Sequence, residues 1–315
     1  MASFFEYVRV DGSVPPAEPG TVDVAILDMN HSWPNVGHDS LVRAVREATE
    51  QIREYWTGVG VRVMSFDVRG AMRIPARGRF QLFIGTGGPG HLDPRLNDGA
   101  AEWSQGIAES ADWEAPLFRL FDDILADRDA ALIAVCHTFG LLCRWSGAAR
   151  AVLRAEKNSG MPTNALTDAG VAHPWFGQFA RRLPDRRHFR VVDNRLFDLI
   201  AERRDDRMIA FENESSDGLT MLELARDAEG MPRLYGVNHH PEIIDREHIM
   251  GVLERKRMEG EVTEAWYGER ASTMLELFTG EHERQSRLTS DYTLLEPLRH
   301  HLWRLVMDWY PISSG

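Results

Sequence analysis

The sequence predicts an α/β fold in which a mostly parallel sheet is flanked by helices, followed by a helical C-terminal extension. Short apolar runs of strand length alternate with segments of helical periodicity in the first half of the chain. Two of these runs lead directly into residue types that are typical of active sites. In sheets of this kind, ligands bind beyond the carboxyl ends of the strands, so the position of both motifs favours a function.

The first half begins with a β, α, β pattern. Residues 1 to 20 are rich in Pro and Gly and are expected to form a loose lead-in, and Val22 to Leu27 is the first apolar strand. Asp39 or Ser40 can cap the helix that follows, and Val61 to Val68 is the next strand. The apolar residues of that helix recur at helical spacing: Leu41, Val45, Ala48, Ile52 and Tyr55.

Two further strands end in the candidate motifs. Phe80 to Ile84 runs into the glycine-rich stretch GTGGPG, and the continuously apolar Ala131 to Val135 runs into Cys136. The sequence HTFGLLCRW after Cys136 is expected to form a helix. Cys136 therefore occupies a predicted strand-to-helix turn.

The second half changes character twice. Its candidate strands, some of them expected to pair antiparallel, are His188 to Val192, Met208 to Glu212, Met221 to Ala225 and Arg233 to Asn238. From Asp245 onward the chain reads as helices, one of them with an apolar stripe at Val262, Trp266, Met274 and Phe278. We therefore expect an α/β domain over residues 1–245 and a helical extension over 246–315 that packs on it.

Composition excludes several classes of protein. The chain has 315 residues, 43% of them hydrophobic, and 48 acidic against 36 basic side chains give a net charge of −12, which argues against nucleic acid as a partner. No basic leader with an apolar stretch and no run of roughly 20 apolar residues is present, so we expect no membrane association and a cytoplasmic location. The only cysteines, Cys136 and Cys143, lie seven apart within one predicted helix and should be free thiols.

Cys136 is the candidate nucleophile. A thiol on a sharp turn between a strand and a helix is exposed as in a nucleophile elbow, and the helix N-terminus favours the thiolate. The alternative is a buried structural cysteine, which is common after an apolar strand.

His240 and Glu242 are its candidate partners. They follow a predicted strand in the segment YGVNHHPEI, and their spacing of two places both side chains on one face of an extended chain. A carboxylate in that position can hold the imidazole while the ring accepts a proton from the thiol. The alternatives are a solvated histidine pair or a metal site at His239 and His240, although adjacent strand residues point in opposite directions. No metal or cofactor is predicted.

The stretch GTGGPGHLDP, from Gly85 to Pro94, suits an oxyanion hole because glycines let backbone N–H groups approach an anion. It has no Lys followed by Ser or Thr, so it does not match a phosphate-binding loop. A plain tight turn is the alternative.

The three motifs IGTGGPG, VCHTFGLL and GVNHHPE, in this order, are similar to the landmark motifs of class I glutamine amidotransferases over roughly residues 22 to 245. The resemblance implies a triad of Cys136, His240 and Glu242, with Gly87 and Gly88 near the oxyanion site and the amide of His137 completing it. It also implies glutamine as the amide substrate, a glutamyl thioester, and ammonia passed to a partner synthase.

The elbow departs from the family pattern. The family usually has glycine two before and two after the cysteine and glutamine four after it, where this chain has Ala134, Thr138 and Gly140. Thr138 is kept among the candidate oxyanion or substrate-binding positions, and glutamine need not be the substrate.

A second resemblance is to homoserine O-acyltransferases, which share the fold, the Cys, His and Glu residues and a helical tail. It includes an EKLSG-like segment at residues 156–160. The sequence thus leaves three functions open: amide cleavage, acyl transfer from acyl-CoA, or a non-catalytic partner-binding protein. Lys157 and Arg195 are the basic residues expected to approach a substrate carboxylate, and Cys143 is expected to pack in the core.

Overall fold

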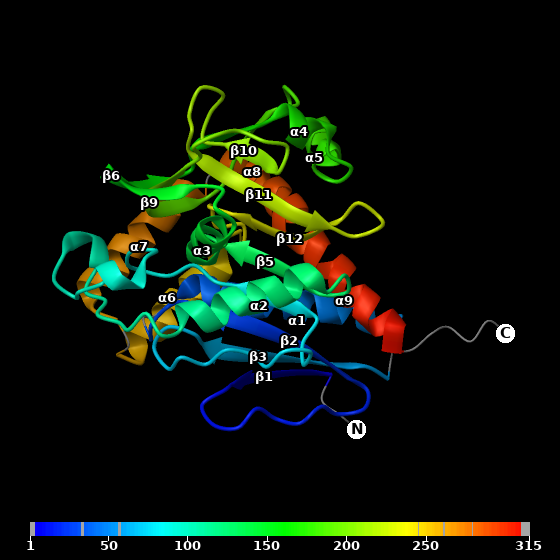
Figure 1. Ribbon diagram of the computed structural model, residues 1–315. Helices are drawn as coiled ribbons and strands as arrows, with labels where there is room; N and C mark the ends of the chain where they lie inside the picture. Colours follow the sequence, from blue (N-terminus) through cyan, green and yellow to red (C-terminus); the bar gives the residue numbers. More distant parts are fainter. Residues whose placement is uncertain are drawn as a thin grey trace.

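The computed structural model describes residues 4–32, 35–55, 58–244, 246–260, 262–278 and 280–309. Within them the chain forms a mixed α/β structure around one large sheet, as predicted from the alternating patterns (Figure 1). The strands are β1 (Phe5–Arg9), β2 (Thr21–Asp28), β3 (Gly60–Asp67), β4 (Leu82–Gly85), β5 (Ala131–Val135), β6 (Arg150–Gly160), β7 (Thr163–Leu166), β8 (His188–Arg190), β9 (Asp193–Ile200), β10 (Met208–Phe211), β11 (Leu219–Arg226) and β12 (Pro232–Val237). The helices are α1 (Val36–Arg53), α2 (Glu114–Ala126), α3 (His137–Ser146), α4 (Asp168–Ala172), α5 (Phe176–Arg182), α6 (Arg246–Met258), α7 (Glu264–Leu277), α8 (Gly280–Ser290) and α9 (Glu296–Trp309).

The central sheet has ten strands among the described residues, in the order β1-β3-β2-β4-β5-β12-β11-β10-β7-β8. The half from β1 to β12 is parallel, and the pairs from β12 to β8 are antiparallel, which confirms the mixed pairing predicted for the second half. Because β4, β5 and β12 are parallel neighbours, their carboxyl ends meet at one edge of the sheet. The three sequence motifs follow these three strands.

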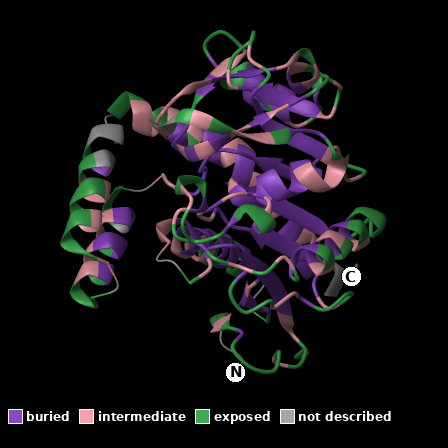
Figure 2. Cartoon of the chain, turned by 60° about the vertical axis from the view of Figure 1, so that its left-hand side comes forward, coloured by how far each residue is buried: buried purple, intermediate pink, exposed green. Residues whose placement is uncertain are grey.

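Helices cover both faces of the sheet (Figure 1). Helices α1, α5 and α9 contribute to the apolar core on one face, and α2 and α3 to the core on the other. Apart from the edge strand β1, the parallel strands are buried on both sides, as the burial colours of Figure 2 show, which explains their continuous apolar runs. Among the described residues, no helix combines the length and the apolar character needed to cross a membrane.

The N-terminal segment is not the loose lead-in predicted from its composition. Residues 5–9 form β1, which pairs in parallel with β3 and extends the sheet by one strand. The buried Arg62 of β3 holds the following loop, since its guanidinium donates to the carbonyl oxygen of Pro16 at 2.7 Å and pairs with Glu18 at 2.7 Å. Pro and Gly in this stretch shape an anchored loop instead of a free end.

The cap of α1 also differs from the prediction. Asn35, and neither Asp39 nor Ser40, caps the helix: its side-chain oxygen accepts from the backbone N–H of Gly37 at 2.6 Å and of His38 at 3.3 Å. The helix begins at Val36, five residues before the predicted apolar stripe starts at Leu41, so the stripe did not reveal its first turn.

A separate pair of antiparallel strands, β6 and β9, stands beside the main sheet. Residues of β9 alternate strictly between buried and half-buried positions. The sequence analysis did not identify either strand, although β9 supplies part of the cavity described below.

The helical tail runs from α6 to α9, as predicted. Helix α9 returns to the main core through Leu298, Leu302 and Val306. Helices α6 and α7 instead share a small apolar cluster that includes Ile249, Leu253, Met274, Phe278 and, from the body, Val192. The boundary at residue 245 between domain and extension stays a prediction.

Removing the charge of Arg62 should destabilise the fold. Arg62 is 2% exposed and its Nε lies 2.8 Å from Asp23 Oδ1, so Arg62→Met removes one of the two arginines that pair with this buried carboxylate and leaves only Arg79. We expect the free energy of unfolding, measured by urea denaturation, to fall by about 1–3 kcal/mol. Arg284→Met, at a side chain that is 74% exposed, is the control and should change it little. Equal stability of both variants would show that the Arg62 network does not hold the N-terminal loop.

Candidate active site

Cys136 stands on a strained turn between β5 and α3. Its backbone has φ +48° and ψ −100°, a conformation that side-chain-bearing residues rarely adopt and that costs about 1–3 kcal/mol. The turn is held by its own backbone: Cys136 N–H donates to Val237 O of β12 at 2.8 Å, and Gly140 N–H donates to Cys136 O at 2.9 Å. This is the geometry of the predicted elbow, and the thiol is half-buried.

Glycines on the neighbouring strands make room for this turn. Ala134, two residues before the thiol, pairs in register with Gly85 of β4 on one side and Gly236 of β12 on the other. A Cβ atom on Gly85 would lie 2.2 Å from Thr138, and one on Gly236 would lie 2.8 Å from the carbonyl oxygen of Ala134. The side chains at positions 134 and 138, where the resembled family has glycine, are therefore accommodated by glycine in the adjacent strands.

Position 140 has no space for a glutamine side chain. A Cβ on Gly140 would come within 2.5 Å of the side chain of Leu92, which lines the cavity in front of Cys136. Leu92 thus occupies the direction in which a side chain at position 140 would extend.

The structure brings His240 and Glu242 together beside the thiol. His240 Nδ1 lies 2.7 Å from Glu242 Oε1, and both residues are buried. A Cβ on Gly87 would lie 2.9 Å from the His240 ring and 3.8 Å from Cys136 Sγ, so the imidazole and the thiol border the same small space. His239 points elsewhere, with its ring 5.9 Å from that of Phe189.

The surroundings favour a protonated His240. Burial by itself lowers the pKa of the imidazole, but the charge of Glu242 and the interactions with Cys136 outweigh burial and raise it well above its usual value. His239, equally buried and without such a partner, has its pKa lowered to about 3 by burial and then by the neighbouring His240. The two adjacent histidines therefore differ in charge.

Glu242 is seated against the first turn of α1. A Cβ on Gly37 would lie 2.6 Å from Glu242 Oε1, so only glycine allows this approach. The positive end of the 18-residue helix favours a carboxylate there. Helix α1 thereby fixes the acid that orients His240.

The glycine-rich loop borders Cys136 and is anchored on its other side by Met29 and Arg69. A Cβ on Gly88 would lie 2.3 Å from the carbonyl oxygen of Met29, which excludes any larger residue. The buried Arg69 donates to the carbonyl oxygens of Met29 at 2.9 Å and Pro89 at 2.6 Å, and it pairs with Glu109 at 2.6 Å. The loop is therefore rigid where it approaches Cys136.

His137 and Thr138 differ in their orientation. His137 lines the cavity with a buried ring whose Nε2 has no partner among the described residues, and burial, followed by the charge of Arg69, lowers its pKa well below the usual value. Thr138 uses both its N–H and its hydroxyl to donate to Thr86 O, at 3.2 Å and 2.8 Å. A contact between Thr138 and a substrate stays a prediction.

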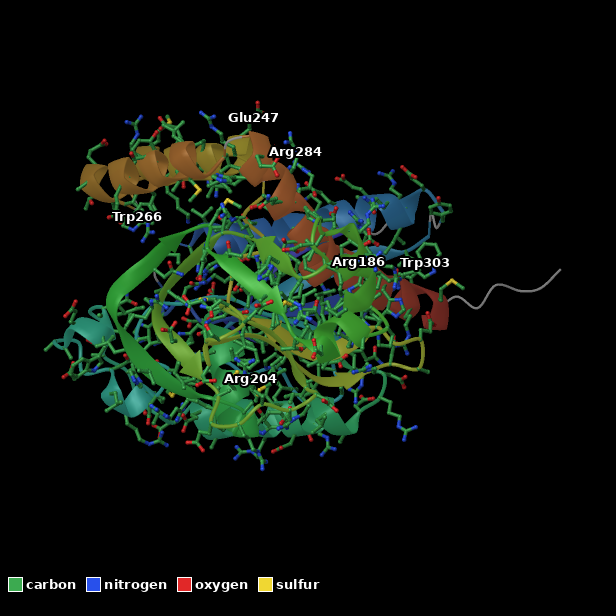
Figure 3. The ribbon with its side chains drawn as sticks, turned by 90° about the horizontal axis from the view of Figure 1, so that it is seen from above. Arg186, Arg204, Glu247, Trp266, Arg284 and Trp303 are labelled. Carbon is green, nitrogen blue, oxygen red and sulfur yellow. The ribbon has the colours of Figure 1, made fainter. Side chains whose placement is uncertain are left out.

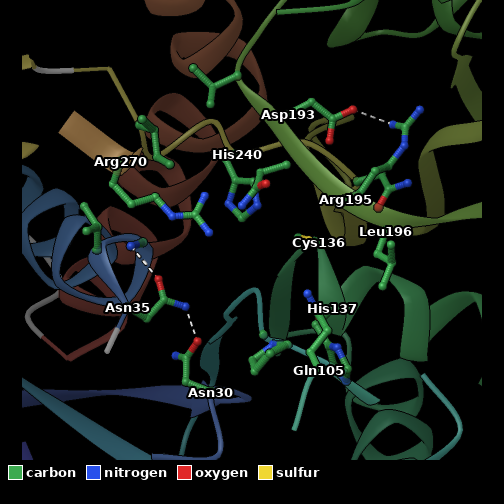
Figure 4. Close-up of a pocket in the computed structure, with 18 of the residues that line it drawn as sticks. Asn30, Asn35, Gln105, Cys136, His137, Asp193, Arg195, Leu196, His240 and Arg270 are labelled. Atoms are coloured by element: carbon green, nitrogen blue, oxygen red, sulfur yellow. Dashed lines mark hydrogen bonds and ion pairs between the residues drawn. The ribbon is translucent and has the colours of Figure 1, made fainter. Parts of the chain in front are cut away.

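A cavity of about 210 Å³ opens in front of Cys136 and His240 (Figure 4). It is smaller than the roughly 300–1,000 Å³ of pockets for drug-sized ligands, so it suits a small molecule. Its walls come from the elbow, the glycine-rich loop, β9 and the helices α6 and α7. The helical tail therefore closes one side of the site.

The basic residues expected near a substrate have different positions. The side chain of Lys157 lies outside the described residues, as do those of Glu156 and Ser159 in the EKLSG-like segment. Arg195 lines the cavity, but its guanidinium is paired with Asp193 at 2.7 Å and Glu212 at 3.1 Å. Cys143 is fully buried, as predicted, and burial raises the pKa of its thiol.

Arg270 of α7 was missed. It lines the cavity from the tail, one helical turn after Trp266 and one before Met274. It thus interrupts the predicted apolar stripe of this helix. A charged residue within an apolar stripe was the signal that could have indicated it.

Comparison with known proteins gives the fold a name. No protein-family model matches the sequence, and no curated protein matches it. Among solved structures, it is similar to a glutamine amidotransferase from Thermotoga maritima, with TM-score 0.50 and 15% identity over 90% of this chain and 98% of that one. It is also similar to a glutamine amidotransferase from Methylobacillus flagellatus, with TM-score 0.51 and 14% identity over 88% and 94%.

The chain has the class I glutamine amidotransferase-like fold. This confirms the fold that the three ordered motifs predicted. At such identities the likeness concerns the fold alone, so the roles of Cys136, His240 and Glu242 depend on the geometry above.

The amidotransferase-like elbow should tolerate Gly85→Ala only when Thr138 is also replaced by a smaller residue. The added methyl would overlap Thr138, and we expect the free energy of unfolding to fall by about 1–3 kcal/mol. In the double variant Gly85→Ala/Thr138→Gly most of that loss should disappear relative to Thr138→Gly alone. Gly12→Ala, where the structure has open space, is the control. Strict additivity in urea denaturation would show that positions 85 and 138 do not compete for space.

Glu242→Gln should lower the pKa of His240. The substitution keeps the shape of the side chain and removes the charge that favours the imidazolium, and the shift can be followed by NMR of histidine-labelled protein. Since the folded-state pKa of His240 is raised, its contribution to stability is complete below the unfolded pKa and is lost as pH rises through the folded one. The difference in the free energy of unfolding between the wild type and Glu242→Gln should therefore become smaller as the pH rises through the folded-state pKa of His240. Glu247→Gln, on the exposed side of α6 (Figure 3), is the control; an unchanged His240 pKa in Glu242→Gln would contradict the pairing.

Proposed function

We propose that this protein is a thiol-dependent amidotransferase or amidohydrolase that cleaves a side-chain amide, that of glutamine, through a thioester on Cys136. The observation that carries the proposal is the buried pair of His240 and Glu242 placed against a thiol on a strained elbow. A structural cysteine needs neither a backbone held in this conformation nor a carboxylate-bound imidazole beside it. The amidotransferase-like fold and the small cavity support the same function.

The proposed reaction has two halves. Cys136 Sγ attacks the amide carbon, His240 holds the thiol proton and transfers it to the leaving nitrogen, and ammonia departs from the acyl thioester. Water then attacks the thioester carbon while His240 accepts its proton, and the carboxylic acid leaves as the thiol is restored. Glu242 stabilises the imidazolium in both halves and keeps its Nδ1 occupied.

The oxyanion of each tetrahedral intermediate is assigned to the backbone N–H groups of Gly88 and His137. Both residues border the cavity beside Cys136, and neither N–H donates to a protein acceptor among the described residues. Gly87 keeps the intervening space open, because any side chain there would meet the His240 ring. The anchoring of the loop through Arg69 provides the rigidity that such stabilisation requires.

The resemblance also implies a partner synthase that receives the ammonia, and we include it in the proposal. The net charge of −12 argues against a nucleic acid as either the partner or the substrate.

Covalent labelling tests the nucleophile directly. A diazo-ketone analogue of glutamine should form a single adduct on the intact protein, detected by mass spectrometry, and glutamine should yield glutamate and ammonia. Cys136→Ala should lose the adduct and at least 1,000-fold in turnover, on the order of what removal of a catalytic nucleophile costs.

Cys143→Ala is the matched control because that thiol is fully buried, and it should keep both adduct and turnover. An adduct that survives Cys136→Ala would refute the assignment. Labelling of Cys136 by a general thiol reagent but not by the glutamine analogue would leave a reactive thiol with a different substrate.

A further inference from the structure

We infer that Arg270 and Asp193 recognise the two charged ends of a free α-amino acid: Arg270 binds the α-carboxylate, Asp193 binds the α-ammonium group, and the amino acid's side chain extends to Cys136. This inference rests on the proposed function and adds the residues that select the substrate. Figure 4 shows the two side chains entering the cavity from different sides, with His240 and Cys136 between them.

Arg270 is a cation without a carboxylate partner among the described residues. It is half-buried, its guanidinium lies 5.7 Å from the ring of Trp266, and it projects from α7 into the cavity (Figure 4). The other cavity-lining arginine, Arg195, is paired with carboxylates. An arginine that is held by an aromatic ring at a cavity wall presents a flat pair of donors, which matches a carboxylate ligand.

Asp193 of β9 is a buried carboxylate with one oxygen in use and one without a partner. Its Oδ2 lies 2.7 Å from Arg195 Nη1 and accepts from Asn158 Nδ2 at 2.9 Å. Its Oδ1 has no hydrogen-bond partner among the described residues, although the residue is only 1% exposed. In Figure 4 this second oxygen points toward the space above Cys136. A buried acceptor without a donor is costly unless a ligand supplies one.

The two features together favour a zwitterion. A cation and an acceptor of opposite charge in one small cavity match a molecule that carries both charges, whereas a dicarboxylate would be repelled by Asp193 and an amine alone would leave Arg270 unused. Other polar side chains that line the cavity, among them Asn30, Gln105 and Asn238, are neutral amides. A peptide-linked residue has neither charged end, so the arrangement selects a free amino acid with a reactive group in its side chain.

The test measures the rate of Cys136 alkylation by a family of probes. The full probe is the diazo-ketone amino acid, its two analogues lack the α-carboxylate or the α-amine, and iodoacetamide is a neutral reagent without either end. In the wild type, removal of either end should lower the second-order alkylation rate by about 30-fold or more, as expected for a lost buried charge contact. The rate with iodoacetamide, measured in every variant, reports the reactivity of the Cys136 thiol itself, and each probe rate is compared after division by it.

The variants assign each end to a residue. Arg270→Met should lose about 30-fold toward the full probe and almost nothing further toward the probe without a carboxylate, and Arg270→Lys should recover part of the loss. Asp193→Asn should also lose about 30-fold toward the full probe, and it should lose almost nothing further toward the probe without an amine. Because Asp193→Asn disturbs a buried pair and could impair folding, the wild-type comparison of probes tests the ammonium contact without any substitution. Arg284→Met, on the exposed side of α8, is the control for lost positive charge.

The outcomes separate the two proposals. Equal reaction of the full probe with wild type and Arg270→Met would overturn the role of Arg270, and equal rates for the full and amine-free probes would overturn that of Asp193. If iodoacetamide alkylates Cys136 but no charged probe does, amino-acid recognition is wrong while the nucleophile stands. If no reagent alkylates Cys136 in the folded protein, the proposed function falls as well.

Discussion

The candidate site depends on one tight turn, the reversal from β5 into α3 at Cys136. That turn is packed between two strands in register, and Gly85 and Gly236 leave the space that Ala134 and Thr138 fill. The same register positions the imidazole. Cys136 N–H bonds to Val237 O at the end of β12, so the chain that continues from β12 reaches His240 directly beside the thiol. The positions of Cys136 and His240 are therefore set by the pairing of two parallel strands, β5 and β12.

The electrostatics of the cavity follow from which buried charges are paired. Glu242 favours the protonated form of the buried His240, and the first turn of α1 supports the carboxylate. Arg195 is also a buried charge, but it is paired with Asp193 of its own strand and with Glu212, so it links β9 to the end of β10. His137 and His239 are neutral because burial dominates their surroundings. Two adjacent residues of the same type can thus carry different charges, because the charge of each depends on the groups around it.

The parts of this structure that were predictable from the sequence are those governed by local patterns. The strands β2, β3 and β5 are continuous apolar runs because both faces of a parallel sheet are covered, and this placed Cys136, His240 and the glycine loop at strand ends. The strand β1 was missed because five residues that include the charged Glu6 and Arg9 carry no clear pattern, and its pairing with β3 is a long-range event. The Asn35 cap, Asp193 and Arg270 were missed for the same reason. Their environment is created by segments far away in the chain, and only tertiary packing places Arg270 of α7 opposite β9.

The covering of the cavity by α6 and α7 has a consequence for the chemical lifetime of the protein. Helix α6 begins four residues after Glu242, and α8 and α9 lead the chain back into the core, so this covering is tied to the body at both ends. A thiol beside an imidazolium is the kind that peroxide oxidises first, to sulfenic acid and then irreversibly further. The helices that narrow the approach to Cys136 therefore also limit the routes by which an oxidant reaches this thiol.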